Sequence, residues 1–453
     1  MEPALNPAGA GPAAPTTCPG YKWRVVLMLW FVCFFNYADR QAISSVLPLL
    51  AKDFNFDDLQ LGLIGSAFAW IYAGAAPFAG MAADRATRKK IIIAACVVWS
   101  CFTLATAWCG NCSSFIFVRA LTGLAEAFYF PAAMSLISDV HAPGTRSRAM
   151  ALHQSAVYAG TILGSWLAAV LAEKSGWNVP FLMFGPIGIL LAIFVSRFLR
   201  EPERGAADGG CGRSGDEGHS SLNGGTQGLR KSAPPLSVAE TWKIIFRSPA
   251  AMFLMAAFLC ANFVAFIFLT WTPKFLFDKF HYSLGAAGLT GAVFINLASA
   301  VSVPFAGLIA DKCVRRFPTG RMLVQFSGLL AGAVFVFLVG QTANVGVLIL
   351  AMTCFGICKG FYDSGIFASL YDTIEPRARG SAAGLMNTVG WGGGALGPVF
   401  VGWVTKHGHY GSESANMGHA IALGGAVYLI GAGLLAFAAF KHARQRGGAA
   451  LAR

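Results

Sequence analysis

The chain has 453 residues, of which 56% are hydrophobic and only 12% are charged, and its mean hydropathy is +0.59. This composition excludes an ordinary soluble domain and predicts a protein that crosses a membrane many times. The net charge of +13 does not indicate a nucleic-acid partner, because the Lys and Arg residues separate apolar stretches instead of sharing one polar face.

Residues 1–20 are rich in Pro, Ala and Gly and predict a disordered tail. Twelve apolar stretches follow, each long enough for a membrane-crossing helix, which needs about 20 residues. The first is too long for a cleaved signal, so we expect it to be retained. In chain order, the predicted spans are 23–50, 58–83, 89–110, 113–137, 146–172, 177–199, 249–276, 284–310, 320–340, 343–371, 379–405 and 416–441. The sequence therefore predicts an all-α integral membrane protein.

The first span carries two adjacent charges, Asp39 and Arg40, close to its midpoint. A charge at the bilayer centre costs at least about 2.5 kcal/mol, so charges that persist there usually face a partner or an aqueous cavity. Adjacent side chains on a helix point about 100° apart. We therefore expect one of the two to face a cavity and the other to face a neighbouring helix. An ion pair that only holds helices together is the alternative.

The connection after the second span is nearly repeated after the eighth. PFAGMAADRATRKK (77–90) and PFAGLIADKCVRRF (304–317) share Pro, Phe, Ala, Gly, Ala, Asp and a following base. A connection that only sets topology needs positive charge. It does not need the repeated acids, Asp84 and Asp311. We interpret both segments as gating loops whose Asp side chains accept hydrogen bonds from helix N-termini or from Arg residues of the other half. The gating residues are Gly80, Asp84, Arg85, Arg88, Gly307, Asp311, Lys312 and Arg315.

The fourth span contains Arg119 and Glu126, seven residues apart. Two helical turns separate them, so they share a face at about 10 Å along the axis. A guanidinium can present two parallel donors to a carboxylate, a phosphate or a sulfonate. A carboxyl group in apolar surroundings can carry a proton. An anion site beside a proton site is thus one interpretation, and a structural pair of Arg119 with Asp39 is the other.

Residues 200–247 include a Gly-, Ser- and Asp-rich stretch that cannot bury a core. We interpret this segment as a linker between an N-terminal six-helix bundle over 21–199 and a C-terminal six-helix bundle over 248–441. Residues 442–453 form a predicted tail.

The two predicted bundles resemble each other residue by residue. A shift of 233 places GLAEAFYFPAAMSLISDVHAPGTR on GICKGFYDSGIFASLYDTIEPRAR and sets Glu126 opposite Lys359 across a central cavity. Lys359 and Asp363 are four residues apart and can pair on one helix face. Gly393 and Gly397 fit a small-residue face for close helix contact better than a nucleotide-binding loop.

Basic residues indicate the topology. Of 34 Lys and Arg residues, 26 fall in the termini and the even-numbered connections and five in the odd-numbered connections, when residues at the ends of spans are counted with the adjoining connection. By the positive-inside rule, both termini are predicted to be cytoplasmic. We expect a multi-pass protein of the plasma membrane, or of the inner membrane if the source is bacterial.

Two similar halves, with Gly80-x-x-x-Asp84-Arg85-x-x-Arg88-Lys89 in one and its echo from Gly307 in the other, resemble the major facilitator superfamily. Thr87 stands where the family loop usually has Gly. The resemblance implies that two bundles rock about a central site and that the loops latch the cytoplasmic side. NYADRQ, RALTGLAEAFYFP, TWTPKFL and GLMNTVGWGGGALGP look most like the organic anion:cation symporters. The charged set is also similar to the Spinster-like lipid transporters.

We therefore predict proton-coupled symport of a small organic anion, such as a sugar acid, a carboxylate or a sulfonate. The predicted substrate-binding residues are Tyr37, Arg40, Arg119, Gln154, Lys359 and Asn387. The predicted proton-coupling residues are Asp39, Glu126 and Asp363. Export of lysolipids, other amphipathic compounds or drugs is the alternative, and a membrane receptor that does not transport is a different class.

The sequence has no Walker loop, no HExxH or GxSxG motif and no metal-ligand cluster. We therefore expect no enzyme activity, no cofactor and no metal. The expected partners are the anion, H⁺ and the lipid bilayer, and the expected state is a monomer.

Overall fold

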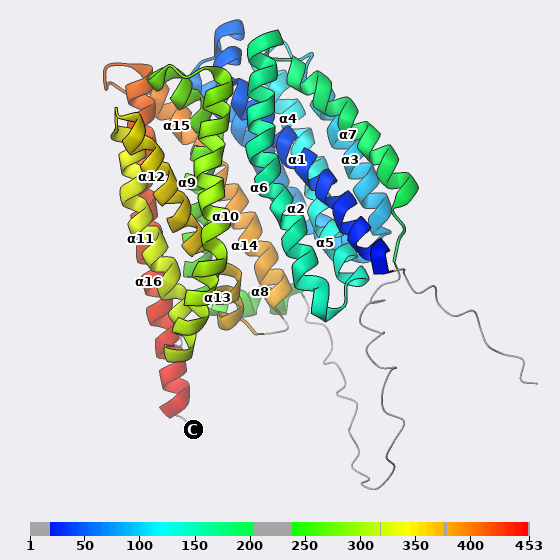
Figure 1. Cartoon of the computed structure of the whole chain (residues 1–453). Coiled ribbons are helices and arrows are strands. Elements are labelled where there is room, and N and C mark those ends of the chain that lie inside the picture. Colours follow the sequence, from blue (N-terminus) through cyan, green and yellow to red (C-terminus); the bar gives the residue numbers. More distant parts are fainter. Residues whose placement is uncertain (1–18, 203–237, 318, 376–377, 452–453) are drawn as a thin grey trace, which may run out of the picture.

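The structure is a computed structural model that describes residues 19–202, 238–317, 319–375 and 378–451. Within these residues the regular elements are all helices, which confirms the all-α prediction (Figure 1). The first seven are α1 (Pro19–Phe54), α2 (Asp58–Arg85), α3 (Arg88–Thr106), α4 (Cys112–Ala127), α5 (Tyr129–Val140), α6 (Pro143–Ser175) and α7 (Val179–Phe198). The others are α8 (Val238–Arg247), α9 (Pro249–Phe280), α10 (Leu284–Arg316), α11 (Gly320–Gln341), α12 (Val345–Asp363), α13 (Ile366–Thr373), α14 (Arg379–Gly394), α15 (Leu396–His407) and α16 (Glu413–Leu451).

Among the described residues, ten helical segments are long and apolar enough to cross a membrane by length and composition. The helices at the first and eleventh predicted spans, α1 and the pair α14 and α15, are not among these ten. They pack in the same bundle nevertheless, α1 against α6 and α15 against α2. The count of twelve spans stays a prediction.

Three predicted spans are each divided into two helices. α4 ends before Phe128, and α14 ends before Ala395. In both places a proline follows three residues after the break, at Pro131 and Pro398. Proline has no amide hydrogen for the carbonyl four residues earlier, and its ring collides with that carbonyl. The third break, between α12 and α13, lies at Gly365, whose φ of −136° and ψ of 2° are not helical.

The helices gather into two groups, α1 to α7 and α9 to α16, which stand side by side in Figure 1. Contacts between the groups run between α6 and α10, between α2 and α14 or α15, and between α1 and α9. We call the side where α7 ends and α9 begins the linker side (bottom of Figure 1), and the opposite side the distal side. α8 lies within the predicted linker, and α16 continues as a helix to Leu451, through most of the predicted tail.

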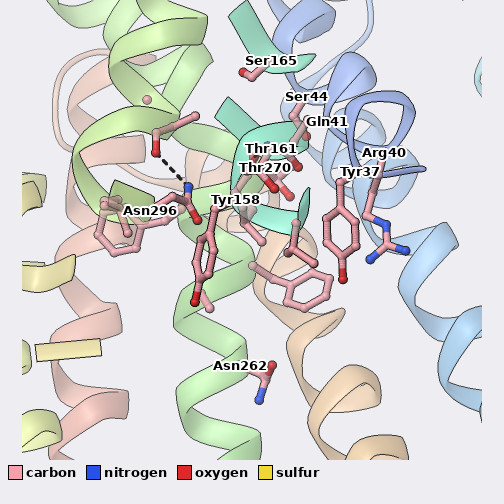
Figure 2. Close-up of a pocket in the computed structure, with 18 of the residues that line it drawn as sticks. Tyr37, Arg40, Gln41, Ser44, Tyr158, Thr161, Ser165, Asn262, Thr270 and Asn296 are labelled. Carbon is pink, nitrogen blue, oxygen red and sulfur yellow. Dashed lines mark hydrogen bonds between the residues drawn. The ribbon is translucent and has the colours of Figure 1, made fainter. Parts of the chain in front are cut away.

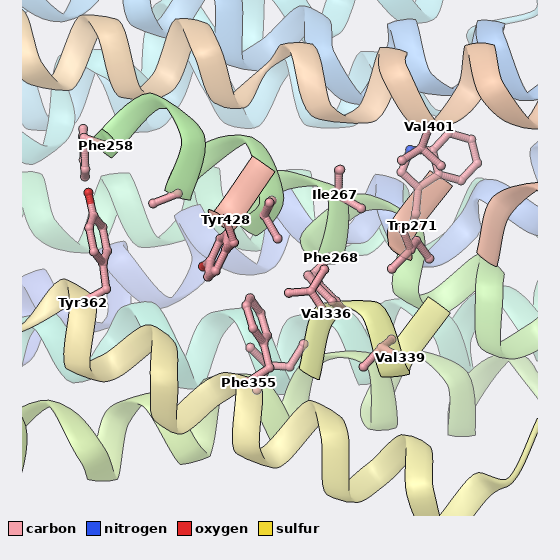
Figure 3. Packing of buried hydrophobic residues seen from close by; sticks show 14 of the residues in the cluster. Phe258, Ile267, Phe268, Trp271, Val336, Val339, Phe355, Tyr362, Val401 and Tyr428 are labelled. Atoms are coloured by element: carbon pink, nitrogen blue, oxygen red, sulfur yellow. The ribbon is translucent and has the colours of Figure 1, made fainter. Parts of the chain in front are cut away.

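Aromatic side chains pack against one another in the core of the second group (Figure 3). The ring of Phe355 stacks on Phe268 with centroids 4.6 Å apart, and the ring centroid of Tyr428 lies 5.6 Å from that of Phe355. The indole of Trp271 donates a 3.0 Å hydrogen bond to the carbonyl of Pro398. This bond joins α9 to the first turn of α15, next to the break between α14 and α15.

Glycines let α6 lie directly against the backbone of α1. A Cβ atom on Gly160 would come within 2.4 Å of the Phe34 carbonyl oxygen, and one on Gly164 within 2.3 Å of the Ala38 Cα. The small-residue face predicted in the second half makes the same kind of contact, because a Cβ on Gly397 would lie 2.4 Å from the Phe263 carbonyl oxygen. Close contact between α6 and α1 therefore fixes the helix that carries Asp39 and Arg40.

Gly164→Val is expected to destabilise the protein by about 1–3 kcal/mol or more, because the larger side chain forces α6 away from α1. The measurement is thermal unfolding in detergent. Gly433→Val is the matched control, since its position has nothing within 4 Å of an added Cβ. Equal losses of thermal stability in the two variants would contradict the close-packing argument.

Candidate functional site

A cavity of about 330 Å³ lies between the two groups of helices. Its wall includes side chains of α1, α2, α4, α6, α9, α10, α12 and α14. Figure 2 shows Tyr37 and Arg40 of α1 on one side and Asn296 of α10 on the other. The cavity is therefore a meeting point of both halves, which is where a ligand can be touched by both.

Arg40 lies at the cavity wall and pairs with Glu126. Its Nη2 atom is 2.7 Å from the Glu126 Oε2 atom, and its Nε atom is 3.2 Å from the same oxygen. The Glu126 side chain is 0% exposed and that of Arg40 is 11% exposed. Breaking a buried ion pair from one side is strongly destabilising, because the remaining charge stays in a medium of low polarity. In this structure Glu126 therefore neutralises the Arg40 charge.

Aromatic rings surround the Arg40 guanidinium. Its central carbon lies 4.4 Å from the ring centre of Tyr37, 4.5 Å from that of Phe68 and 5.2 Å from that of Trp391. Cation–π contacts of this kind contribute about 2 kcal/mol when they are desolvated. Trp391 belongs to the second half of the chain, so a charge on α1 is in contact with both halves.

Asp39 points away from the cavity, towards α3. It is 2% exposed, and its Oδ2 atom accepts a 3.3 Å hydrogen bond from the Thr103 hydroxyl. Its Oδ1 atom has no partner among the described residues. Of the two adjacent charges, Arg40 thus lies at the cavity and Asp39 lies against a neighbouring helix. The alternative pairing of Asp39 with Arg119 is not formed in this structure.

Arg119 of α4 is a buried cation at the cavity wall without an ion-pair partner in the described part of the chain. Its side chain is largely covered, at 5% exposure for the residue, and its Nε atom has no hydrogen-bond partner there. The ring centre of Phe68 lies 5.0 Å from its guanidinium carbon. A buried charge is costly unless it is paired. An anion entering the cavity would supply the missing partner.

The second half contributes a neutralised charge pair and amides. Lys359 and Asp363 of α12 both line the cavity and form the predicted pair. Asn262 and Asn296 each donate 2.8 Å hydrogen bonds to carbonyls of their own helices, which leaves their side-chain oxygens available. Glu126 is not part of the cavity wall, because Arg40 lies between it and the cavity.

Two of the other three residues predicted to bind substrate lie at the cavity, and one does not. Tyr37 and Gln154 line the cavity, whereas Asn387 does not. Sequence reasoning missed Phe68, Asn262 and Tyr158. Asn262 was the detectable one, because an amide within an apolar span is uncommon. The aromatic residues gave no signal, since aromatic residues in such spans mostly pack.

The gating loops bond within their own halves. Arg88, 1% exposed, pairs with Asp139 and with Glu201, whose carboxylate also accepts the backbone N–H of Lys89 at 2.7 Å. This places an acid at the N-terminus of α3, where the helix dipole favours it. Asp311 accepts a 3.1 Å bond from Arg321 of the next helix. The prediction for the gating acids was a bond to the other half, but Asp311 bonds within its own half in this structure. The side chain of the other gating acid, Asp84, lies outside the described residues.

The remaining residues predicted for the gating loops make no close packing contacts in the described part of the chain. Arg85, Lys312 and Arg315 are exposed. A Cβ added at Gly80 or Gly307 would meet nothing within 4 Å. Neither glycine is therefore required by close packing in this conformation.

Two ion pairs and a hydrogen bond join the two halves on the distal side. Lys274 of α9 lies 3.1 Å from Asp58 of α2 and 2.6 Å from Asp278. Lys406 of α15 lies 2.8 Å from Asp57, the residue that caps α2. Glu173 of α6 accepts a 2.8 Å bond from the backbone N–H of Gly285 in α10. Sequence reasoning missed these contacts. It counted Lys274, near the end of the predicted span 249–276, with the connection that follows, and it had no means of pairing residues from different halves.

The Asp57 carboxylate is stabilised at this closed end. Partial burial disfavours its charge, but hydrogen bonds from Lys406 and from the backbone of Gln60 outweigh burial and lower the pKa of Asp57. The same Asp57 forms a capping box with Gln60 at the start of α2. The cap of α2 and the contact with Lys406 of the other half therefore both use one ionised side chain.

Comparisons with known proteins agree with this architecture. The sequence matches the model of the Major Facilitator Superfamily over residues 29–398. It is 27% identical over 394 residues to "Ascorbate transporter, chloroplastic" of Arabidopsis thaliana, covering 86% of this chain and 71% of that protein. It is 27% identical over 412 residues to "Probable galactarate/D-glucarate transporter GudP" of Bacillus subtilis, covering 88% of each.

A solved structure shares the fold. A bacterial homologue of the human lysosomal transporter Spinster, in an inward-facing and unoccupied conformation, superimposes with a TM-score of 0.78. The sequence identity is 21%, and the match covers 94% of this chain and 98% of the other.

Proposed function

The chain belongs to the major facilitator superfamily, and from this we propose that it transports a small organic anion by alternating access, with protons as the coupling ion. The protein is a transporter and not an enzyme. Two relatives are named for ascorbate and for galactarate or D-glucarate, which are sugar acids. These names support an anionic, hydroxylated substrate of similar size.

The observation that carries the proposal is Arg119 at the cavity wall, which has no ion-pair partner among the residues that the structure describes. A carboxylate can accept two parallel hydrogen bonds from a guanidinium, which gives both affinity and orientation. The amide oxygens of Asn262 and Asn296 on the opposite helices can accept hydrogen bonds from hydroxyl groups of the same substrate. Lys359 supplies a second cation when it separates from Asp363.

Proton coupling is proposed to act through Glu126. A proton on Glu126 removes the partner of Arg40, and an anion in the cavity then neutralises the released cation. Substrate and proton are thereby proposed to bind together. A proton alone leaves Arg40 without a compensating anion, and glucarate, a dianion, gains Arg40 as a second cation beside Arg119 only when Glu126 is protonated. Asp39 and Asp363 are the further acids that we propose to take part.

We propose that the linker side is cytoplasmic and that this conformation is inward-facing. The basic residues favour this orientation. The contacts of Lys274, Lys406 and Glu173 support it, because they join the two halves at the distal end. A plasma-membrane location and a monomeric state complete the proposal.

Transport of lysolipids or other amphipathic compounds is a second candidate. It is favoured by the aromatic part of the cavity wall, which includes Phe258, Phe266, Phe268, Phe355 and Trp391. Such a substrate would need a large apolar surface. The charged wall around Arg119 and the volume of about 330 Å³ fit a small anion better.

The test is counterflow in proteoliposomes with D-glucarate and, separately, lysophosphatidylcholine. We expect exchange of labelled glucarate by the native chain. Arg119→Gln should weaken apparent glucarate affinity at least about 30-fold, because it removes one side of a buried charge pair. Arg148→Gln, an exposed arginine on the linker side, is the matched control.

Three outcomes would contradict the proposal. Unchanged glucarate exchange in Arg119→Gln would remove the arginine from the site. Exchange of lysophosphatidylcholine alone would favour the second candidate. Saturable glucarate binding without counterflow would indicate a receptor.

A further inference from the structure

A second hollow of about 310 Å³ lies on the first half of the molecule, away from the central cavity. It is formed by α2, α3, α4 and Phe128 at the start of α5, and it shares no lining residue with the central cavity. Its lining is apolar throughout: Ala82, Ile91, Ala94, Ala95, Val98, Ala125 and Phe128. We call this hollow the α2–α3 groove.

The groove has the depth of one membrane leaflet. On α3 its lining extends from Ile91 to Val98, and the helix begins at Arg88. At about 1.5 Å per residue, Val98 lies about 15 Å from the start of the helix, which is half of a hydrocarbon core of about 30 Å. Ala94 and Val98 are exposed, so the groove opens outwards. At this depth the surrounding medium is hydrocarbon, and the matching occupant is an acyl chain.

Positive charge stands at the linker-side end of the groove. Lys90 is four residues before Ala94 and therefore on the same face of α3, and Arg85 is three residues after Ala82 on α2. Both side chains are exposed. Neither is in an ion pair with a described residue, whereas the neighbouring Arg88 is buried against Asp139 and Glu201. Two cations at headgroup level attract anionic lipids.

We propose that the α2–α3 groove binds an anionic phospholipid of the linker-side leaflet. One acyl chain lies along Ala94 and Val98, and the phosphate contacts Lys90 and Arg85. Alanines supply four of the seven lining residues, which is why space for a chain remains between the helices. The lipid would brace α2, the helix whose distal end carries Asp57 and Asp58 and whose side contacts α14 and α15. The inference is independent of the transported substrate.

The test is lipid binding to the full chain by native mass spectrometry, with dioleoyl phosphatidylglycerol and dioleoyl phosphatidylcholine as separate probes. The native chain is expected to retain phosphatidylglycerol more strongly than phosphatidylcholine. Lys90→Gln should lower its retention about fivefold, the effect of about one basic residue, without changing retention of the choline lipid. Ala94→Trp should lower retention of both lipids, because the indole fills the groove.

Arg148→Gln is the matched control for charge, since it removes an exposed cation of the same side away from the groove. It should leave the retention of both lipids unchanged. Equal retention of the two lipids by the native chain would overturn the proposal. So would a Lys90→Gln variant that retains phosphatidylglycerol as the native chain does, or an Ala94→Trp variant that retains both lipids. Thermal unfolding of each variant separates loss of the site from loss of the fold.

Discussion

Glu126→Gln is expected to abolish acid-driven accumulation of the anion while leaving anion binding largely intact. Glu126 holds Arg40 through Nη2 at 2.7 Å and through Nε at 3.2 Å, and its own side chain is fully covered. The amide has nearly the same shape as the acid but cannot exchange a proton or carry a negative charge. Arg40 is then released permanently towards the cavity, so the anion can bind at any pH.

The expected measurement has two parts. In proteoliposomes with an inward proton gradient, accumulation of labelled D-glucarate should fall at least about tenfold, equivalent to about 1.4 kcal/mol of coupling. Glucarate binding in detergent should persist and should lose its dependence on pH. A variant that cannot take up the coupling proton can still bind the anion, but the proton gradient can no longer drive its accumulation. Binding without accumulation would therefore show that Glu126 serves proton coupling and not substrate recognition.

Glu375→Gln is the control, because Glu375 is an exposed acid on the linker side. It should accumulate glucarate as the native chain does. Undiminished, pH-driven accumulation by Glu126→Gln would remove Glu126 from the proton path and leave Asp39 or Asp363 as the coupling acid. Loss of binding together with accumulation would instead assign Glu126 to the support of Arg40.

The helices could be predicted from the sequence because membrane spans are long and apolar. The predicted span 320–340 and the helix Gly320–Gln341 differ by a single residue. The breaks within spans could not be predicted in this way. Pro48 and Pro77 lie inside unbroken helices, whereas Pro131 and Pro398 follow breaks. Neighbouring helices decide which freed carbonyl is satisfied, and sequence alone does not specify neighbours.

The charges of the candidate site could be predicted from the sequence, but of its ion pairs only the one within a single helix could be. Arg40, Arg119 and Glu126 stand out because a charge within an apolar span is expensive. The pairing of Arg40 with Glu126 joins residues 86 apart in the chain, so it depends on where the bundle places α1 relative to α4. Lys359 and Asp363 were paired correctly because they are four apart on one helix. Local spacing is readable from sequence, and tertiary proximity is not.

Lys274→Met is expected to open the distal side. Lys274 lies between Asp58 of the other half and Asp278 of its own helix, and Lys274 and Asp58 have side chains only 5% and 6% exposed. Loss of the cation leaves the Asp58 charge buried without its partner, a cost of about 3–5 kcal/mol. When the halves separate at the distal end, water reaches Asp58. That conformation therefore avoids the free-energy penalty of a buried, unpaired carboxylate. The population should therefore shift towards distal opening.

The measurement is a spin-label distance between Gly110 and Ala343, exposed positions on the distal side of the two halves, in a cysteine-depleted chain. Lys274→Met should lengthen this distance, and Asp58→Asn combined with Lys274→Met should restore it, because no buried charge remains.

Lys406→Met is the matched control. Its pair with Asp57 also joins the halves, but the two side chains are 41% and 38% exposed, and such pairs contribute less than about 1 kcal/mol. If both single variants lengthened the distance equally, burial would not be what makes Lys274 the stronger contact. If neither did, the packing of α2 against α15, where a Cβ on Gly402 would lie 2.2 Å from the Asp58 carbonyl oxygen, would be sufficient to hold the distal side closed without the ion pairs.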